Sequence, residues 1–252
     1  MFSFPGYMDE SVKNDEWFVL SCLVGHGTQW SYVELAWLRM LQKINESLKA
    51  QGRKTISRYH AADCSNLQRE FKDWTKDEQI ALTQKIVHIF RYHPLRVISY
   101  SVNLRELVSE IPETKPDPVG FACVLLLYFL MPEIWEVIIS NESSVDASDK
   151  VTLIHDRCAY DGALFDAFTQ MKNDPNFQYA DRFTTIAPFG WEDCIPLQPA
   201  DLLAYENLKE AELKTAGLKR RKSLELLLDL NAFGGRAKGI NAEILKKCGM
   251  ST

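Results

Sequence analysis

The chain has 252 residues, 46% of them hydrophobic and 25% charged, proportions that disfavour a disordered or low-complexity protein. Its 29 Lys and Arg residues against 34 Asp and Glu residues give a net charge of −5, so nucleic acid binding would need a local basic patch or metal ions. The six cysteines form no Cys-x-x-Cys pair, which predicts neither a structural zinc site nor a disulfide framework and favours a reducing, cytoplasmic location.

The first half of the chain is predicted to contain three strands and two helices. Short aromatic and β-branched segments at 2–9 and 16–24 flank a polar run, as in an antiparallel hairpin. Apolar residues at helical spacing predict helices at 31–50 and about 77–92, the second closed by Pro94. Residues 95–104 have the composition of a third strand.

The second half is predicted to alternate helices and strands. Three prolines within 111–118 predict a loop, and a buried helix follows from 119 to about 139. Its most apolar run, 119–131, is shorter than the roughly 20 residues of a membrane-spanning helix, so no membrane is expected. The remaining predicted elements are strands at 151–156 and 182–187 and helices at 159–171, 197–213 and 222–230.

This order of elements predicts an α/β fold with an RNase H-like mixed five-stranded sheet flanked by helices. A helical insertion of about residues 28–92 separates the second and third strands. We expect one domain over residues 1–215 and a C-terminal helical extension over 216–252.

Three fragments carry a family resemblance: Gly-Tyr-Met-Asp-Glu-Ser at 6–11, Leu-Ile-His-Asp-Arg at 153–157 and Leu-Gln-Pro-Ala-Asp-Leu-Leu-Ala-Tyr at 197–205. Together, across roughly residues 4–210, they resemble the domain-of-unknown-function family numbered 3800. Val12 replaces the family's usual Gly and Pro199 its usual Leu, which a first-turn position in a helix would tolerate. The resemblance implies an RNase H-like fold and a metal-dependent phosphodiesterase site.

Physical chemistry points to the same carboxylates. The first and fourth strands of an RNase H-like sheet are parallel neighbours, so Asp9 and Asp156 would lie side by side at one edge. Their repulsion would be relieved by Mg²⁺ or Mn²⁺, two ions in a phosphodiesterase, with Asp201 as a third ligand from the late helix. A fourth acid is left open among three candidates, Glu10, Asp161 and Asp193, with Glu10 preferred as a catalytic helper.

Each of these acids also has a structural explanation. Asp9 suits a turn, Asp156 suits a helix N-cap, and Asp201 suits the first turn of a helix, where the dipole favours an acid. Their occurrence in order, each after the expected element, favours the metal site. His155 alternates to the opposite face of its strand and is expected to point away from it.

Further residues are predicted to bind substrate. His60 and Asp63 lie in a loop of the insertion, where the alternative is a loop histidine with an acid cap, and Gln198 either orients a water or caps its helix. A basic run could bind phosphates or form a solvated helix end; it includes Lys219, Arg220 and Arg221. Trp191 is a candidate platform for base stacking.

The leading hypothesis is a nuclease that cleaves DNA or RNA with a metal-activated water. The alternative is a catalytically silent nucleic-acid-binding or regulatory subunit acting with a partner protein. A third hypothesis is an interaction protein that docks through the insertion. The sequence leaves open a homo-oligomer. Metal affinity discriminates the first hypothesis from the second, and an exposed apolar patch on the insertion would favour the third.

Overall fold

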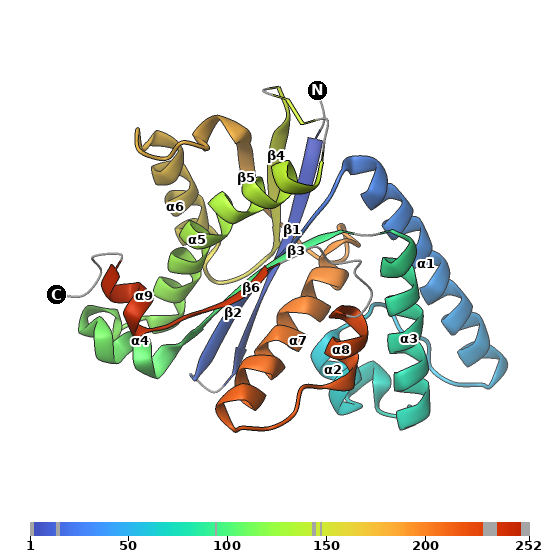
Figure 1. The fold of residues 1–252 in the computed structure, drawn as a ribbon. Helices are drawn as coiled ribbons and strands as arrows, with labels where there is room; N and C mark the ends of the chain where they lie inside the picture. Colours follow the sequence, from blue (N-terminus) through green and yellow to red (C-terminus); the bar gives the residue numbers. More distant parts are fainter. Residues whose placement is uncertain are drawn as a thin grey trace.

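The computed structural model describes residues 3–13, 16–93, 95–142, 145–146, 148–228 and 236–247. Within them, one mixed sheet contains β1 (Ser3–Lys13), β2 (Trp17–Val24), β3 (Arg96–Asn103), β4 (Lys150–Asp156), β5 (Phe183–Phe189) and β6 (Arg236–Ile240). The strands lie in the order β5-β4-β1-β2-β3-β6, and helices flank the sheet (Figure 1). The α/β class expected from the sequence is confirmed.

The strand directions divide the sheet into two parts. β1, β2 and β3 are antiparallel, as expected, while β4 runs parallel to β1 and β5 parallel to β4. The expectation of five strands is wrong, because β6 pairs parallel with β3. The segment 216–252 is therefore not only a helical extension. Its strand, Arg-Ala-Lys-Gly-Ile, has little intrinsic strand preference and depends on the edge that β3 offers.

Helices cover both faces of the sheet (Figure 1). The longer ones are α1 (Gly27–Ala50), α3 (Lys76–Tyr92), α5 (Pro118–Asn141), α6 (Asp161–Asn173) and α7 (Leu197–Thr215). One core joins α5 and α6 to Phe4 and Met8 of β1, and the other joins α1, α3 and α7 to the opposite face, where Tyr7 packs. Since side chains alternate along a strand, Asp9 lies on the α7 face and Glu10 on the α5 face.

The insertion between β2 and β3 contains α1, α2 (Ala61–Asn66), a 3₁₀ turn (Arg69–Phe71) and α3. α1 begins at Gly27 rather than at residue 31, because His26 and Gln29 form a capping box at its start. Thr75 and Glu78 form a second capping box at the start of α3. The insertion is helical, as expected.

α5 is the most apolar element of the fold. Among the described residues it is the one helix long and apolar enough to cross a membrane, and most of it is buried against β2, β3 and α6. It continues through Pro132 and Glu133, where the sequence suggested that the apolar run stops. Glu133 is buried and accepts hydrogen bonds from Tyr100 and Lys238.

Shorter elements complete the fold: α4 (Leu104–Glu110), 3₁₀ turns at Pro112–Thr114 and Ala180–Arg182, α8 (Lys222–Leu228) and α9 (Ala242–Lys247). α4 follows β3 directly, because the Asn103 side chain accepts hydrogen bonds from the first backbone amides of the helix. The predicted strand start at residue 2, the helix stop at 94 and the helix end at 229–230 lie outside the described residues.

Candidate active site

A cavity of about 240 Å³ lies beside the second half of β1, the end of β4 and the start of α7. The side chains predicted for the site that line it are Asp9, Glu10, His60, Asp156, Gln198 and Asp201. They come from β1, β4, α7 and the loop before α2, segments that are far apart in the sequence. The fold therefore gathers the carboxyl groups of Asp9, Asp156 and Asp201 around one small volume. Glu10 also lines it, although its side chain alternates to the α5 face of the sheet.

The parallel register of two strands places the first pair of acids. β1 and β4 pair from Ser3 with Lys150 up to Met8 with His155, so Asp9 and Asp156 are the next residues on each strand. Both follow the alternation to the same face of the sheet. The Asp9 carboxylate accepts a hydrogen bond from the Glu10 amide at 2.9 Å, and Asp156 accepts one from the Arg157 amide at 2.9 Å.

The first turns of α7 supply the third acid and the amide. Pro199 is the third residue of α7, a position where its missing N–H leaves no hydrogen bond unmade. Asp201 accepts a hydrogen bond from the Ala61 amide at 2.8 Å, which joins α7 to the insertion. Asp201 is therefore held in place by the chain segment that carries His60.

Gln198 makes a second junction between α7 and the insertion. Its Oε1 accepts the Trp37 indole N–H at 3.0 Å and the Tyr59 amide at 2.9 Å. Its Nε2 is buried and has no hydrogen-bond partner among the described residues. Because Oε1 is occupied, the amide is fixed, and Nε2 is left as a donor in a cavity lined by acids.

Burial and mutual repulsion raise the pKa values of these acids. Burial raises the pKa of Asp9 well above its ordinary value, and the charges of Asp201, Glu10 and Asp156 raise it further. Burial also raises the pKa of Glu10, to about 7. The negative charges of Asp156 and Asp201 act on both Asp9 and Glu10, and they make it harder for either carboxyl to lose its proton.

Two neighbouring side chains, His60 and Arg58, oppose this effect at the remaining acids. Burial raises the pKa of Asp201, while the charges of His60 and Arg58 act to lower it. Burial likewise raises the pKa of Asp156, against the lowering influence of its bond from the Arg157 amide and the charge of Arg58. The compensation is incomplete, so the pKa values of both Asp156 and Asp201 stay raised.

The donors fit Mg²⁺ or Mn²⁺. Both cations take oxygen ligands, and Asp9, Asp156 and Asp201 offer carboxylate oxygens from three separate elements. A divalent cation would also offset the repulsion that raises the pKa of Asp9. Of the three candidates for a fourth acid, Glu10 lines the cavity, and its described lining does not include Asp161 or Asp193.

The other predicted substrate-binding residues, Asp63, Lys219, Arg220 and Arg221, are not in the described lining of the cavity. Asp63 stands behind His60, with its Oδ2 2.8 Å from His60 Nδ1, and so positions the imidazole. Arg220 pairs with Glu210 at 2.8 Å, and Arg221 lies 3.5 Å from Glu206. Lys219 is exposed.

Sequence reasoning missed Arg58, the lining residue with a permanent positive charge. Its guanidinium lies 4.2 Å from the centre of the Trp191 ring, and both residues line the cavity. Trp191 therefore meets a cation here. No local motif marks Arg58, and its place depends on the bonds from Tyr59 and Ala61 to α7.

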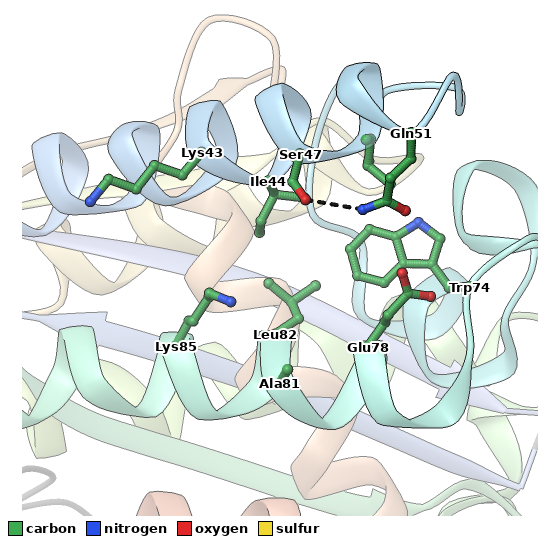
Figure 2. A pocket seen from close by; sticks show the side chains of 10 residues that line it. Lys43, Ile44, Ser47, Gln51, Trp74, Glu78, Ala81, Leu82 and Lys85 are labelled. Atoms are coloured by element: carbon green, nitrogen blue, oxygen red, sulfur yellow. Dashed lines mark hydrogen bonds between the residues drawn. The ribbon is translucent and has the colours of Figure 1, made fainter.

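A second cavity, of about 230 Å³, lies between α1 and α3 (Figure 2). Lys43 extends from α1 and Lys85 from α3, with Trp74 at one end near Gln51. Gln51 donates a hydrogen bond to Ser47 at 3.1 Å, as drawn in Figure 2. The described lining of this second cavity contains none of the predicted site residues, and it includes two lysines and one acid rather than a group of carboxylates.

Comparison of the chain with protein-family models, with curated proteins and with solved structures finds no match. The geometry of the acidic cavity is therefore the basis for assigning a function.

Proposed function

We propose that this protein is a divalent-metal-dependent nuclease with an RNase H-like domain. The observation that carries the proposal is the convergence of Asp9, Asp156 and Asp201 on one cavity, with Glu10 beside them. Burial and like charges make this arrangement unfavourable without a cation, because they raise the pKa of Asp9. Carboxylates placed against their own repulsion are typical of functional sites.

The sheet supports the RNase H-like part of the proposal. Strands β3, β2, β1, β4 and β5 are neighbours in this order, with β1 to β3 antiparallel and β4 parallel to β1. The insertion between β2 and β3 also matches the expectation from the sequence. β6 is an addition on the outer edge of β3. The likeness to the family numbered 3800 stays part of the proposal.

In this proposal Asp9, Asp156 and Asp201 hold Mg²⁺ or Mn²⁺, and Glu10 assists. When bound, two such ions supply a water for in-line attack on phosphorus and stabilise the departing oxygen. Gln198 donates its free Nε2–H to a phosphate oxygen, which the fixed amide does without reorganisation. Arg58, oriented by Trp191, attracts the phosphate to an otherwise acidic cavity.

Cleavage assays test the proposal. Wild type, Asp9→Asn and Asp201→Asn are incubated with labelled single-stranded, duplex and hybrid nucleic acids, in Mg²⁺, in Mn²⁺ and in chelator. We expect metal-dependent cleavage by the wild type and its loss in both variants. Asp166→Asn is the matched control, because Asp166 is an exposed acid on α6. Cleavage by Asp9→Asn at the wild-type rate, or cleavage in chelator, would contradict the proposal.

The alternative is a silent nucleic-acid-binding or regulatory subunit that acts with a partner protein. Large exposed apolar side chains on α1 and α3 favour the third hypothesis, a protein that docks onto another chain through the insertion; they are Tyr32, Leu35, Leu38, Ile80 and Tyr92. A silent subunit has no use for a cavity of buried, mutually repelling acids. Failure of the wild type to bind Mn²⁺, even with nucleic acid present, would favour this alternative.

A further inference from the structure

A second group of metal-ligating side chains lies on the other face of β4. His155, Cys158 and Asp161 each offer one ligand atom, and these atoms all lie within 4.8 Å of one another. His155 is buried and next to Asp156, but the alternation of the strand turns it toward the α5 side. The described lining of the acidic cavity does not include these three side chains.

Local contacts hold the three side chains in this arrangement. His155 Nδ1 lies 2.9 Å from the backbone carbonyl of Asp156, a contact that fixes the ring. The Cys158 amide donates to Asp161 Oδ1 at 2.9 Å, and that oxygen lies 3.6 Å from His155 Nδ1. The Arg157 amide donates to the Phe189 carbonyl at 3.0 Å and ties the same loop to β5.

The chemistry of this group differs from that of the acidic cavity. An imidazole nitrogen, a thiolate sulfur and a carboxylate oxygen suit a metal of intermediate softness, whereas Mg²⁺ prefers oxygen alone. Ligand atoms around tetrahedral zinc are about 3.5 Å apart, so the three groups need to close by about 1 Å. Cys158 and Asp161 are only partly buried, which leaves their side chains room for this adjustment.

We propose that His155, Cys158 and Asp161 form a Zn²⁺ site on the face of the sheet opposite Asp156, with a water at the fourth position. The spacing His-x-x-Cys-x-x-Asp is not that of a zinc finger, so no sequence pattern announces it. The ion would join the end of β4 to the start of α6. It would thereby hold the loop that follows Asp156.

Cobalt substitution tests the site in the full chain. Co²⁺ is titrated into chelator-treated protein, and the near-ultraviolet band of sulfur-to-cobalt charge transfer is recorded. We expect the band in the wild type and its loss in Cys158→Ser. Cys194→Ser is the matched control, because Cys194 is also partly buried but lies outside the cluster, and it should keep the band. Zn²⁺ should displace the cobalt and abolish the band.

Two further measurements keep the test decisive. Asp201→Asn should retain the band, because the carboxylates of the acidic cavity contribute no sulfur ligand. The two proposals are therefore tested separately: the Zn²⁺ site can fail while the nuclease proposal stands, and the nuclease proposal can fail while the Zn²⁺ site stands. Zn²⁺ should also slow alkylation of Cys158 in the wild type at least tenfold, which needs no variant. Absence of the band from the wild type, its survival in Cys158→Ser, or alkylation unaffected by Zn²⁺ would overturn the proposal.

Discussion

At the scale of single residues, Gln198 links the helical insertion to the cavity. The sequence suggests two roles for it, a helix cap or a group that orients a water, and cannot choose between them. Its Oε1 binds Trp37 and Tyr59, which lie 161 and 139 positions away in the sequence. These long-range bonds determine which end of the amide faces the acids, and no local pattern reports them.

Replacing Gln198 should therefore affect stability and activity separately. Gln198→Ala leaves the buried N–H groups of Trp37 and Tyr59 without an acceptor, and we expect the free energy of unfolding to fall by about 1–3 kcal/mol. Gln198→Glu keeps an acceptor but removes the donor, so it should fold and lose cleavage. Denaturant unfolding and cleavage assays measure the two effects. Gln42→Ala, at an exposed position on α1, should change neither.

Glu10 predicts a dependence of stability on pH. Its pKa is about 7 in the folded protein and about 4.3 in an unfolded chain, so the folded state binds the proton more tightly. This contribution to stability is complete below about pH 4.3 and is lost as the pH rises through about 7. In chelator, the stability of the wild type relative to Glu10→Gln should fall between about pH 5 and about pH 8.

Unfolding curves at several pH values measure this difference. Glu113→Gln is the control, because Glu113 is exposed and lies outside the cavity lining. A stability difference between wild type and Glu10→Gln that does not change with pH would contradict the raised pKa of Glu10.

At the scale of elements, the strands of the first hairpin and the long helices could be predicted because their apolar residues follow a clear period. The strand β6 could not, because Arg-Ala-Lys-Gly-Ile becomes a strand only through pairing with β3. α4 is not predicted from the sequence, because this short helix lies between a strand and the proline-rich loop at 111–118. Asn103 is a typical N-cap residue and is the signal that could have indicated the helix.

The packing of β6 can be tested at Ile240, which is 4% exposed in the core under α5. We expect Ile240→Ala to lower the free energy of unfolding by about 2–4 kcal/mol, because it removes buried methyl groups and leaves a cavity. Ile139→Ala is the matched control on α5; Ile139 is 49% exposed, and its truncation should change stability by less than about 0.5 kcal/mol. Equal effects of the two substitutions would show that β6 contributes no packing.

At the scale of the whole molecule, the cavity is lined by five segments of the chain, from Asp9 to Tyr205. That Asp9 and Asp156 lie together could be predicted from the sequence, because their strands are parallel neighbours. The predicted end of the first strand at residue 9 is wrong, since β1 continues to Lys13. The place of Arg58 could not be predicted, since a long loop carries it. Because the net charge is −5, phosphate binding would depend on individual basic side chains near the site. In the described structure the basic side chain at the cavity is Arg58, rather than Arg220 or Arg221.

A bound cation should stabilise the whole fold as well as the site. At a concentration of 100 times its dissociation constant, a ligand that binds only the folded state adds about 2.7 kcal/mol. We therefore expect Mn²⁺ to raise the Tm of the wild type and to leave that of Asp9→Asn almost unchanged. In chelator at about pH 8, Asp9→Asn should unfold at a higher temperature than the wild type, because it removes a buried, repelled carboxyl group.

Calorimetric titration of Mn²⁺ into the wild type and Asp9→Asn is the most direct test of the acidic cavity as a metal site. We expect saturable binding by the wild type and no binding by Asp9→Asn. Binding should release protons, because the pKa of Glu10, raised to about 7, keeps part of this carboxyl protonated at neutral pH. Binding of equal affinity by both proteins, or by neither, would contradict the metal site and leave the four acids with a structural role.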